Sequence, residues 1–153
     1  MKLRRIKRVI VGGLAVAALT GALSLSALAG DYVSVAKNSV NVRSGPDTSY
    51  KVLYELPIDY PLSVMSRKGQ WLKVVDVDGD KGWIYEKLVS NTPFVIVTSK
   101  ECNIRSGPGT DTSIVGTVVK DVLLKKEGSK GDWIRISHAQ VEGWIHRNLV
   151  WPR

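Results

Sequence analysis

Cysteine and phenylalanine are almost missing from this 153-residue chain, which has one of each. The single cysteine, Cys102, excludes an intramolecular disulfide framework and any metal site built from several cysteines. Acidic residues are missing before Asp31, whereas five lysines and arginines lie within the first eight positions. Without residues 1–29, 17 basic side chains stand against 14 acidic ones. The remaining charge is too small to indicate a nucleic-acid partner, and we expect none.

Catalytic motifs are missing as well: the chain has no H-E-x-x-H, G-x-S-x-G, Walker loop or dinucleotide fingerprint. We therefore expect no enzymatic activity, no cofactor and no metal site. Asp76, Asp78 and Asp80 have the spacing with which an EF-hand loop begins. Such a loop would also need glycine and an acidic residue where the chain has Lys81 and Lys87. We predict a solvated hairpin there instead.

Residues 1–29 have the three parts of a secretory signal peptide. A basic head (MKLRRIKR) precedes an apolar run from Val9, and small residues lead to Ala27-Leu28-Ala29. We expect a signal helix, cleavage after Ala29, and export to the periplasm, the cell wall or the extracellular space. The alternative is an uncleaved anchor, because Val9 to Leu28 is just long enough to span a bilayer. Only in that case would we expect attachment to a membrane.

The rest of the chain is a tandem repeat of one sequence unit. Asn41 to Pro46 (NVRSGP) recurs 62 residues later as Asn103 to Pro108 (NIRSGP). At this offset 11 of the 31 positions from 41 to 71 are identical, whereas chance would give roughly two. Two copies of such length indicate tandem domains, with boundaries at 30–90 and 91–153.

Each copy has the pattern of short strands separated by turn residues. Asp78-Gly79 lies between two of these runs and is a strong hairpin signal. No sustained helical period occurs after residue 29, so we predict an all-β barrel or sandwich in each copy. The strands expected in the first copy are Tyr32–Val35, Val40–Val42, Val52–Leu56, Leu62–Ser66, Trp71–Val75 and Lys81–Tyr85.

This duplicated pattern resembles the bacterial Src homology 3 domain. The motifs that carry the resemblance are Asn-hydrophobic-Arg-Ser-Gly-Pro, Trp-x-x-hydrophobic (Trp71, Trp133) and Gly-Trp-Ile (from Gly82 and Gly143). The family usually places glycine in the turn before the middle strand, and in this chain Asp59 and Asp121 stand near that point; aspartate tolerates turn geometry. The resemblance implies two tandem small SH3-like barrels, each of five to seven strands, in an exported envelope protein that binds peptidoglycan or its peptides.

Strand alternation places a set of aromatic, arginine and asparagine side chains on the outer face of each copy. The tryptophans are either a binding platform or a seal over the core. The arginines either hold loop carbonyl groups or clamp a ligand. The candidate ligand-binding residues are Asn41, Arg43, Trp71, Trp83, Tyr85, Asn103, Arg105, Trp133, Trp144 and His146.

Two residues of the second copy have no close counterpart in the first. Cys102 replaces Val40, which favours a small buried hydrophobic residue over a nucleophile assisted by His138 or His146. Trp151 replaces Ser90 and is either a plug at the end of the barrel or a contact residue.

We therefore expect a non-enzymatic exported protein whose tandem barrels recognise peptidoglycan or a wall peptide. The alternative is an adaptor that binds an envelope protein, for example a separately encoded wall hydrolase. A cysteine enzyme using Cys102 is the third hypothesis, and full wall-related activity in Cys102→Ser would exclude it.

Overall fold

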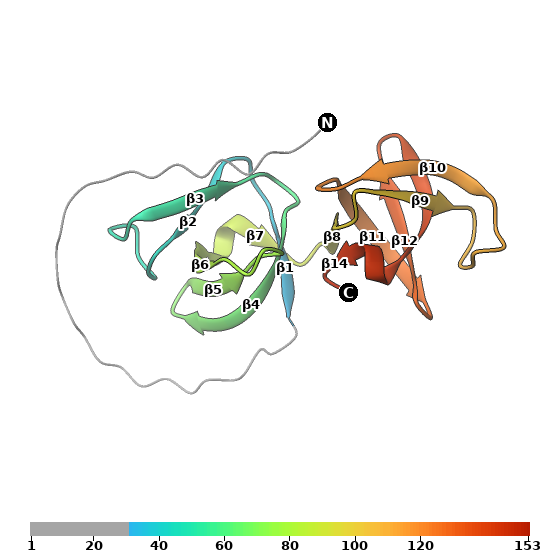
Figure 1. Ribbon diagram of the computed structural model, residues 1–153. Coiled ribbons are helices and arrows are strands. Elements are labelled where there is room, and N and C mark those ends of the chain that lie inside the picture. Colours follow the sequence, from blue (N-terminus) through green and yellow to red (C-terminus); the bar gives the residue numbers. More distant parts are fainter. Residues whose placement is uncertain (1–30) are drawn as a thin grey trace.

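The computed structural model describes residues 31–153, and all their regular structure is β-strand apart from two single-turn 3-10 segments. The all-β prediction is confirmed, with one barrel for each copy of the repeat (Figure 1). The expected signal helix lies outside the described residues. Within residues 31–153 no helix is long and apolar enough to cross a membrane.

The first barrel is one antiparallel sheet in the order β3-β2-β6-β5-β4-β1-β7. Each strand predicted from the sequence is present within three residues at either end. The elements are β1 (Tyr32–Val35), β2 (Val40–Arg43), β3 (Val52–Leu56), β4 (Pro61–Lys68), β5 (Trp71–Val75), β6 (Lys81–Tyr85), η1 (Glu86–Leu88) and β7 (Val89–Ser90).

The second barrel repeats this order with β10-β9-β13-β12-β11-β8-β14. The shared topology confirms that the chain is a tandem duplication of one fold. The elements are β8 (Phe94–Val97), β9 (Glu101–Arg105), β10 (Ile114–Val119), β11 (Leu123–Lys130), β12 (Trp133–His138), β13 (Val141–His146), η2 (Arg147–Leu149) and β14 (Val150–Trp151).

Alternate aliphatic side chains of each sheet point inward and form its core. Val42, Val74 and Ile84 are fully buried in the first barrel, and Ile104 and Ile145 take the same positions in the second. Among residues 31–153 the buried hydrophobic side chains form two clusters, one centred on each barrel.

Three turns depend on backbone conformations that few residues adopt. Asp59 and Asp121 have φ angles of 68° and 70°, in the left-handed region that aspartate tolerates better than most residues. Gly79 has a φ of 83° in the β5–β6 hairpin, where the Asp78-Gly79 pair predicted a turn. The sequence thus specified the location of each of these reversals.

The β5–β6 hairpin is less solvated than the sequence suggested. Asp76 is only 2% exposed, and its Oδ1 accepts the backbone N–H groups of Asp78 and Asp80, both at 3.0 Å. Asp78 is the exposed residue of the three, and Asp80 is partly buried. The prediction of a solvated hairpin is therefore wrong for Asp76, because its carboxylate turns inward to hold the loop.

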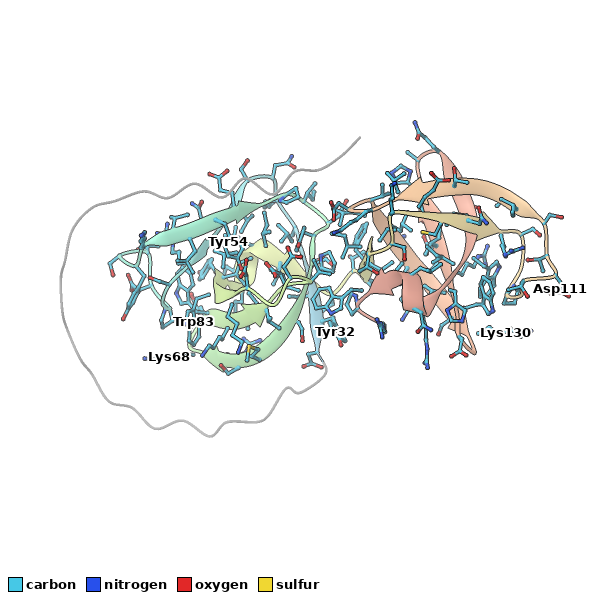
Figure 2. All side chains as sticks on the ribbon, viewed as in Figure 1. Tyr32, Tyr54, Lys68, Trp83, Asp111 and Lys130 are labelled. Atoms are coloured by element: carbon cyan, nitrogen blue, oxygen red, sulfur yellow. The ribbon has the colours of Figure 1, made fainter. Side chains whose placement is uncertain are left out.

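The two barrels touch through aromatic and aliphatic side chains. Tyr32 of β1 lies near their junction (Figure 2), and its ring meets the Trp151 ring edge-on with centroids 6.1 Å apart. Ile96 and Leu123 of the second barrel belong to the hydrophobic cluster of the first, and Trp151 packs against that cluster. Trp151 is thus a contact residue between the barrels, which resolves the alternative left open by the sequence.

Candidate ligand-binding groove

The outer face of β5 and β6 carries a pair of aromatic side chains. Trp71 lies directly opposite Tyr85 in the antiparallel register, and their ring centroids are 5.5 Å apart with the planes tilted by 52°. Both residues are partly exposed, whereas their neighbours Leu72 and Ile84 are buried. The pair therefore presents aromatic surface to solvent on the outer face of two central strands of the sheet, as the alternation predicted.

These two rings form one wall of a groove of about 490 Å³. Its other walls come from the β1–β2 turn, from β2, and from the loop after Arg43. Segments separated by more than twenty residues of sequence therefore meet in one concave surface. The lining residues are Lys37, Asn38, Ser39, Val40, Asn41, Arg43, Asp47, Thr48, Trp71, Tyr85 and Leu88.

The Arg43 guanidinium braces the loop that borders the groove. Its Nη1 donates to the carbonyl oxygens of Thr48 and Tyr50, both at 2.9 Å. Arg105 repeats this role in the second barrel, where Nη1 donates to the Thr112 carbonyl oxygen at 2.7 Å. The geometry thus favours the loop-bracing interpretation of these arginines, although Arg43 also faces the groove.

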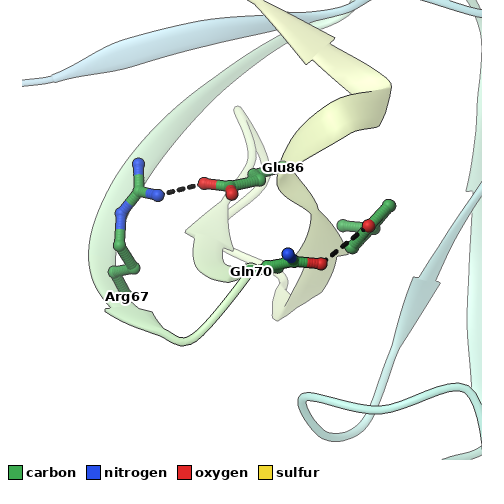
Figure 3. Close-up of polar contacts among 4 residues, drawn as sticks. Arg67, Gln70 and Glu86 are labelled. Atoms are coloured by element: carbon green, nitrogen blue, oxygen red, sulfur yellow. Dashed lines mark hydrogen bonds and ion pairs between the residues drawn. The ribbon is translucent and has the colours of Figure 1, made fainter.

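Hydrogen bonds hold Tyr85 in place. The Tyr85 hydroxyl donates to Gln70 Oε1 at 2.8 Å, and the next residue, Glu86, forms an ion pair with Arg67 (Figure 3). The Glu86 N–H also donates to the Gln70 carbonyl oxygen at 2.9 Å. Because its hydroxyl is hydrogen-bonded to Gln70, the phenol ring of Tyr85 has a fixed orientation toward Trp71.

The polar part of the groove contains both signs of charge. Lys37 and Arg43 supply cations, and Asp47 supplies a carboxylate. A hydrogen bond from the Ser49 N–H to Asp47 Oδ1, at 2.9 Å, lowers the pKa of Asp47, so this side chain is anionic at neutral pH. A ligand with both an amino and a carboxylate group would find a partner for each along one aromatic wall.

Four of the five residues predicted in the first copy line this groove: Asn41, Arg43, Trp71 and Tyr85. The fifth, Trp83, lies outside the lining and is paired across strands with Arg43 and Lys73. Sequence reasoning missed the residues that the two loops and η1 contribute. These are Lys37, Asn38, Ser39, Asp47, Thr48 and Leu88.

The second copy keeps the pattern with different chemistry. Trp133 lies opposite His146, with ring centroids 5.3 Å apart and an edge-on orientation, and Trp144 lies opposite both Arg105 and Arg135. Asn103 is exposed on β9. An imidazole thus replaces the phenol of the first copy, so the two outer faces offer different hydrogen-bonding groups.

Cys102 lies in the core of the second barrel, as predicted from its equivalence to Val40 in the first copy of the repeat. It is 7% exposed, and its Sγ is 3.8 Å from the Val118 carbonyl oxygen. Burial, followed by the charge of Glu101, raises the pKa of the thiol. A nucleophilic cysteine needs the opposite shift.

Among residues 31–153, no three histidine, cysteine or acidic side chains are grouped so that they could hold a metal ion.

Comparison with known proteins places both copies in one family. The family described as "Bacterial SH3 domain" matches residues 36–91 and again residues 98–152. The chain is also 27% identical, over 138 residues, to the "Putative N-acetylmuramoyl-L-alanine amidase YrvJ" of Bacillus subtilis (strain 168). That alignment covers 83% of this chain but only 26% of the relative, so the chain spans about a quarter of the length of that protein.

Solved structures give weaker likenesses. NlpC2 from Trichomonas vaginalis aligns with 80% of this chain and 48% of its own, at 16% identity and a TM-score of 0.36. An NlpC/P60 family protein from Bacillus cereus aligns with 78% of this chain and 55% of its own, at 15% identity and a TM-score of 0.37. Scores this low carry no argument about the site.

Proposed function

The chain belongs to the bacterial SH3 domain family, and from this premise we propose that it is a non-enzymatic exported protein that binds peptidoglycan through its peptide part. The observation that carries the proposal is the groove of the first barrel, where the Trp71–Tyr85 wall faces a cation and a carboxylate. Similarity to a protein named as an N-acetylmuramoyl-L-alanine amidase supports a place at the cell wall.

The chemistry of the groove suits a short peptide with charged ends. Partly exposed rings offer flat apolar area with little conformational entropy to lose on binding. Lys37 and Asp47 lie on loops at the side of this wall, where they can pair with a carboxylate and an amine of the ligand. Asn41 adds an amide that both donates and accepts hydrogen bonds. The peptide part of peptidoglycan carries the amine, carboxylate and amide groups that these side chains can bind.

The second outer face adds a further contact in this proposal. Trp133 and His146 occupy the positions of Trp71 and Tyr85, so a polymer that repeats one peptide can meet both faces of the same molecule. Two weak contacts joined by a short linker raise the overall affinity without new contacts at either site. Binding to intact wall should therefore exceed binding to a single soluble wall peptide.

The test is co-sedimentation of residues 30–153 with purified cell-wall sacculi. Trp71→Ala removes half of the aromatic wall and should weaken binding by about tenfold, a loss that corresponds to roughly 1.4 kcal/mol. Trp133→Ala should cost less, because His146 supplies a smaller ring opposite it. The matched control is Met65→Ala, since Met65 is exposed on β4 outside the groove lining.

Two outcomes would contradict the proposal. One is that sacculi fail to retain the wild-type protein while an envelope protein does, which would establish the adaptor function instead. The other is that Trp71→Ala, with an unchanged circular dichroism spectrum, binds sacculi as well as the wild type. Either result would remove the groove of the first barrel from the account of recognition.

A further inference from the structure

Strand β10 of the second barrel carries an unusual amount of exposed apolar surface. Ile114, Val115 and Val119 are 55%, 48% and 38% exposed, and they are three of the seven large hydrophobic residues exposed in residues 31–153. The strand reads IVGTVV and contains no charged residue and no proline. Nothing in the groove of the first barrel accounts for this surface.

The position of β10 in the sheet makes its sequence significant. In the sheet order β10 is terminal and pairs only with β9 (Figure 1). A terminal strand presents backbone N–H and C=O groups to a further strand, and proteins usually protect such edges with charge, proline or a covering element. β10 lacks the first two of these protections.

The first barrel shows what a protected edge looks like at the same place. β3 is the terminal strand of that sheet, and at the repeat offset Leu53, Glu55 and Pro57 correspond to Val115, Thr117 and Val119. A second β3 laid antiparallel about Glu55 would bring two carboxylates together, and Pro57 has no N–H to donate. The same arrangement about Thr117 meets neither obstacle.

We propose that β10 is a self-association edge, at which two copies of this protein pair antiparallel around a two-fold axis through Thr117. In this register Thr117 faces Thr117 of the second copy, and Val115 faces Val119 of the second copy. Threonine pairs and pairs of β-branched residues are among the favourable cross-strand combinations. The absence of charge allows the strand to pair with itself, because a charged residue on the two-fold axis would face the same charge of the second copy.

The apolar surface beside the strand extends this interface. Val115 to Val119 border a groove of about 440 Å³, whose other walls are Val122, Leu123 and the turn from His138 to Val141. Pairing of one six-residue strand buries less area than a standard stable interface, so we expect a weak dimer with a dissociation constant on the order of 10–100 µM. Two copies bound to one polymer would be held together more strongly.

The test is sedimentation velocity of residues 30–153 between about 5 µM and about 500 µM, a range that brackets the expected constant. The wild type should shift from monomer to dimer across this range. Thr117→Lys places two ammonium groups opposite each other and should leave a monomer at every concentration. The matched control is Glu55→Lys at the equivalent position of β3, which should associate like the wild type.

A charge-swap experiment separates loss of the interface from loss of the fold. Thr117→Lys and Thr117→Glu should each be monomeric alone and should form a heterodimer when mixed, since opposite charges then face each other. A wild type that stays monomeric to the highest concentration would overturn the proposal. So would a dimer that Thr117→Lys leaves intact, or variants that show no heterodimer on mixing. None of these readings depends on wall binding, so the two proposals can fail separately.

Discussion

Individual residues differ between the copies in ways that conserve the local geometry. Glu86 pairs with Arg67 in the first barrel, whereas its counterpart Arg147 pairs with Asp132 at 3.0 Å in the second. Asp132 stands where the first copy has Gln70, and Arg67 corresponds to Ser129, so the second copy forms its ion pair from a different position of the turn. Exposed pairs of this kind add at most about 1 kcal/mol to the free energy of unfolding. Their value is local, because they fix the turn beside Tyr85 or His146.

At the residue scale, Cys102 should behave as a core side chain. Cys102→Val should change the free energy of unfolding by less than about 1 kcal/mol, since Val40 already fills this position in the first barrel. Cys102→Asp should cost more than about 3 kcal/mol, because a carboxylate would be buried without a partner. Urea denaturation measures both. In parallel, a thiol reagent should label the native protein far more slowly than the unfolded chain, and rapid native labelling would contradict this assignment.

At the scale of a secondary element, the reversal before each middle strand depends on one aspartate. Asp59 and Asp121 occupy positions with φ near 70°. The Asp59 N–H donates to the Val35 carbonyl oxygen at 2.8 Å, and the Asp121 N–H donates to the Val97 carbonyl oxygen at 2.9 Å. The turn therefore closes onto the first strand of each barrel in the same way. Glycine has the conformational freedom that a φ near 70° requires.

The stability of variants at Asp59 should depend on how well the new residue tolerates a positive φ. Asp59→Gly should change the free energy of unfolding by less than about 0.5 kcal/mol. Glycine adopts a positive φ without strain, but it loses more conformational entropy on folding than aspartate does, and the two effects oppose each other. Asp59→Val should lower it by about 2 kcal/mol, since a β-branched residue is strained in the left-handed region. Thermal denaturation of both variants gives the comparison. Met65→Val, on a strand of ordinary conformation, is the control; equal stability of all three would show that the turn is not under this constraint.

At the scale of the whole molecule, the contact between the barrels decides whether they move as one body. Only residues 91–93 separate β7 from β8, and Trp151 places its ring against Tyr32 and the cluster of the first barrel. An aromatic pair of this geometry contributes about 0.5–1.5 kcal/mol beyond its buried area. Together with Ile96 and Leu123, it extends the hydrophobic cluster of the first barrel onto the second barrel.

Loss of this contact should uncouple the barrels without unfolding them. In the wild type, ¹⁵N relaxation should give one rotational correlation time for both barrels, because they tumble together. Trp151→Ala should give two shorter, distinct correlation times. Ser90→Ala, at the position that matches Trp151 in the first copy, should leave the single value unchanged. A wild type that already shows two correlation times would indicate that the aromatic contact does not hold the barrels together.

The sequence by itself determined the duplication, the strands, the inward faces, the positions of the turns and the buried state of Cys102. These features are local: a period of two assigns each side chain to a face, and turn residues mark where the chain reverses. They also placed Trp71 and Tyr85 on the outer face correctly.

Only the tertiary structure decided which of those outer residues share a groove, that Asp76 turns inward, and that Trp151 meets Tyr32. The β1–β2 turn and the loop after Arg43 join the Trp71–Tyr85 wall through closure of the barrel, not through any sequence period. The physical reason is that strand alternation fixes the direction of a side chain, whereas its neighbours depend on how distant segments pack.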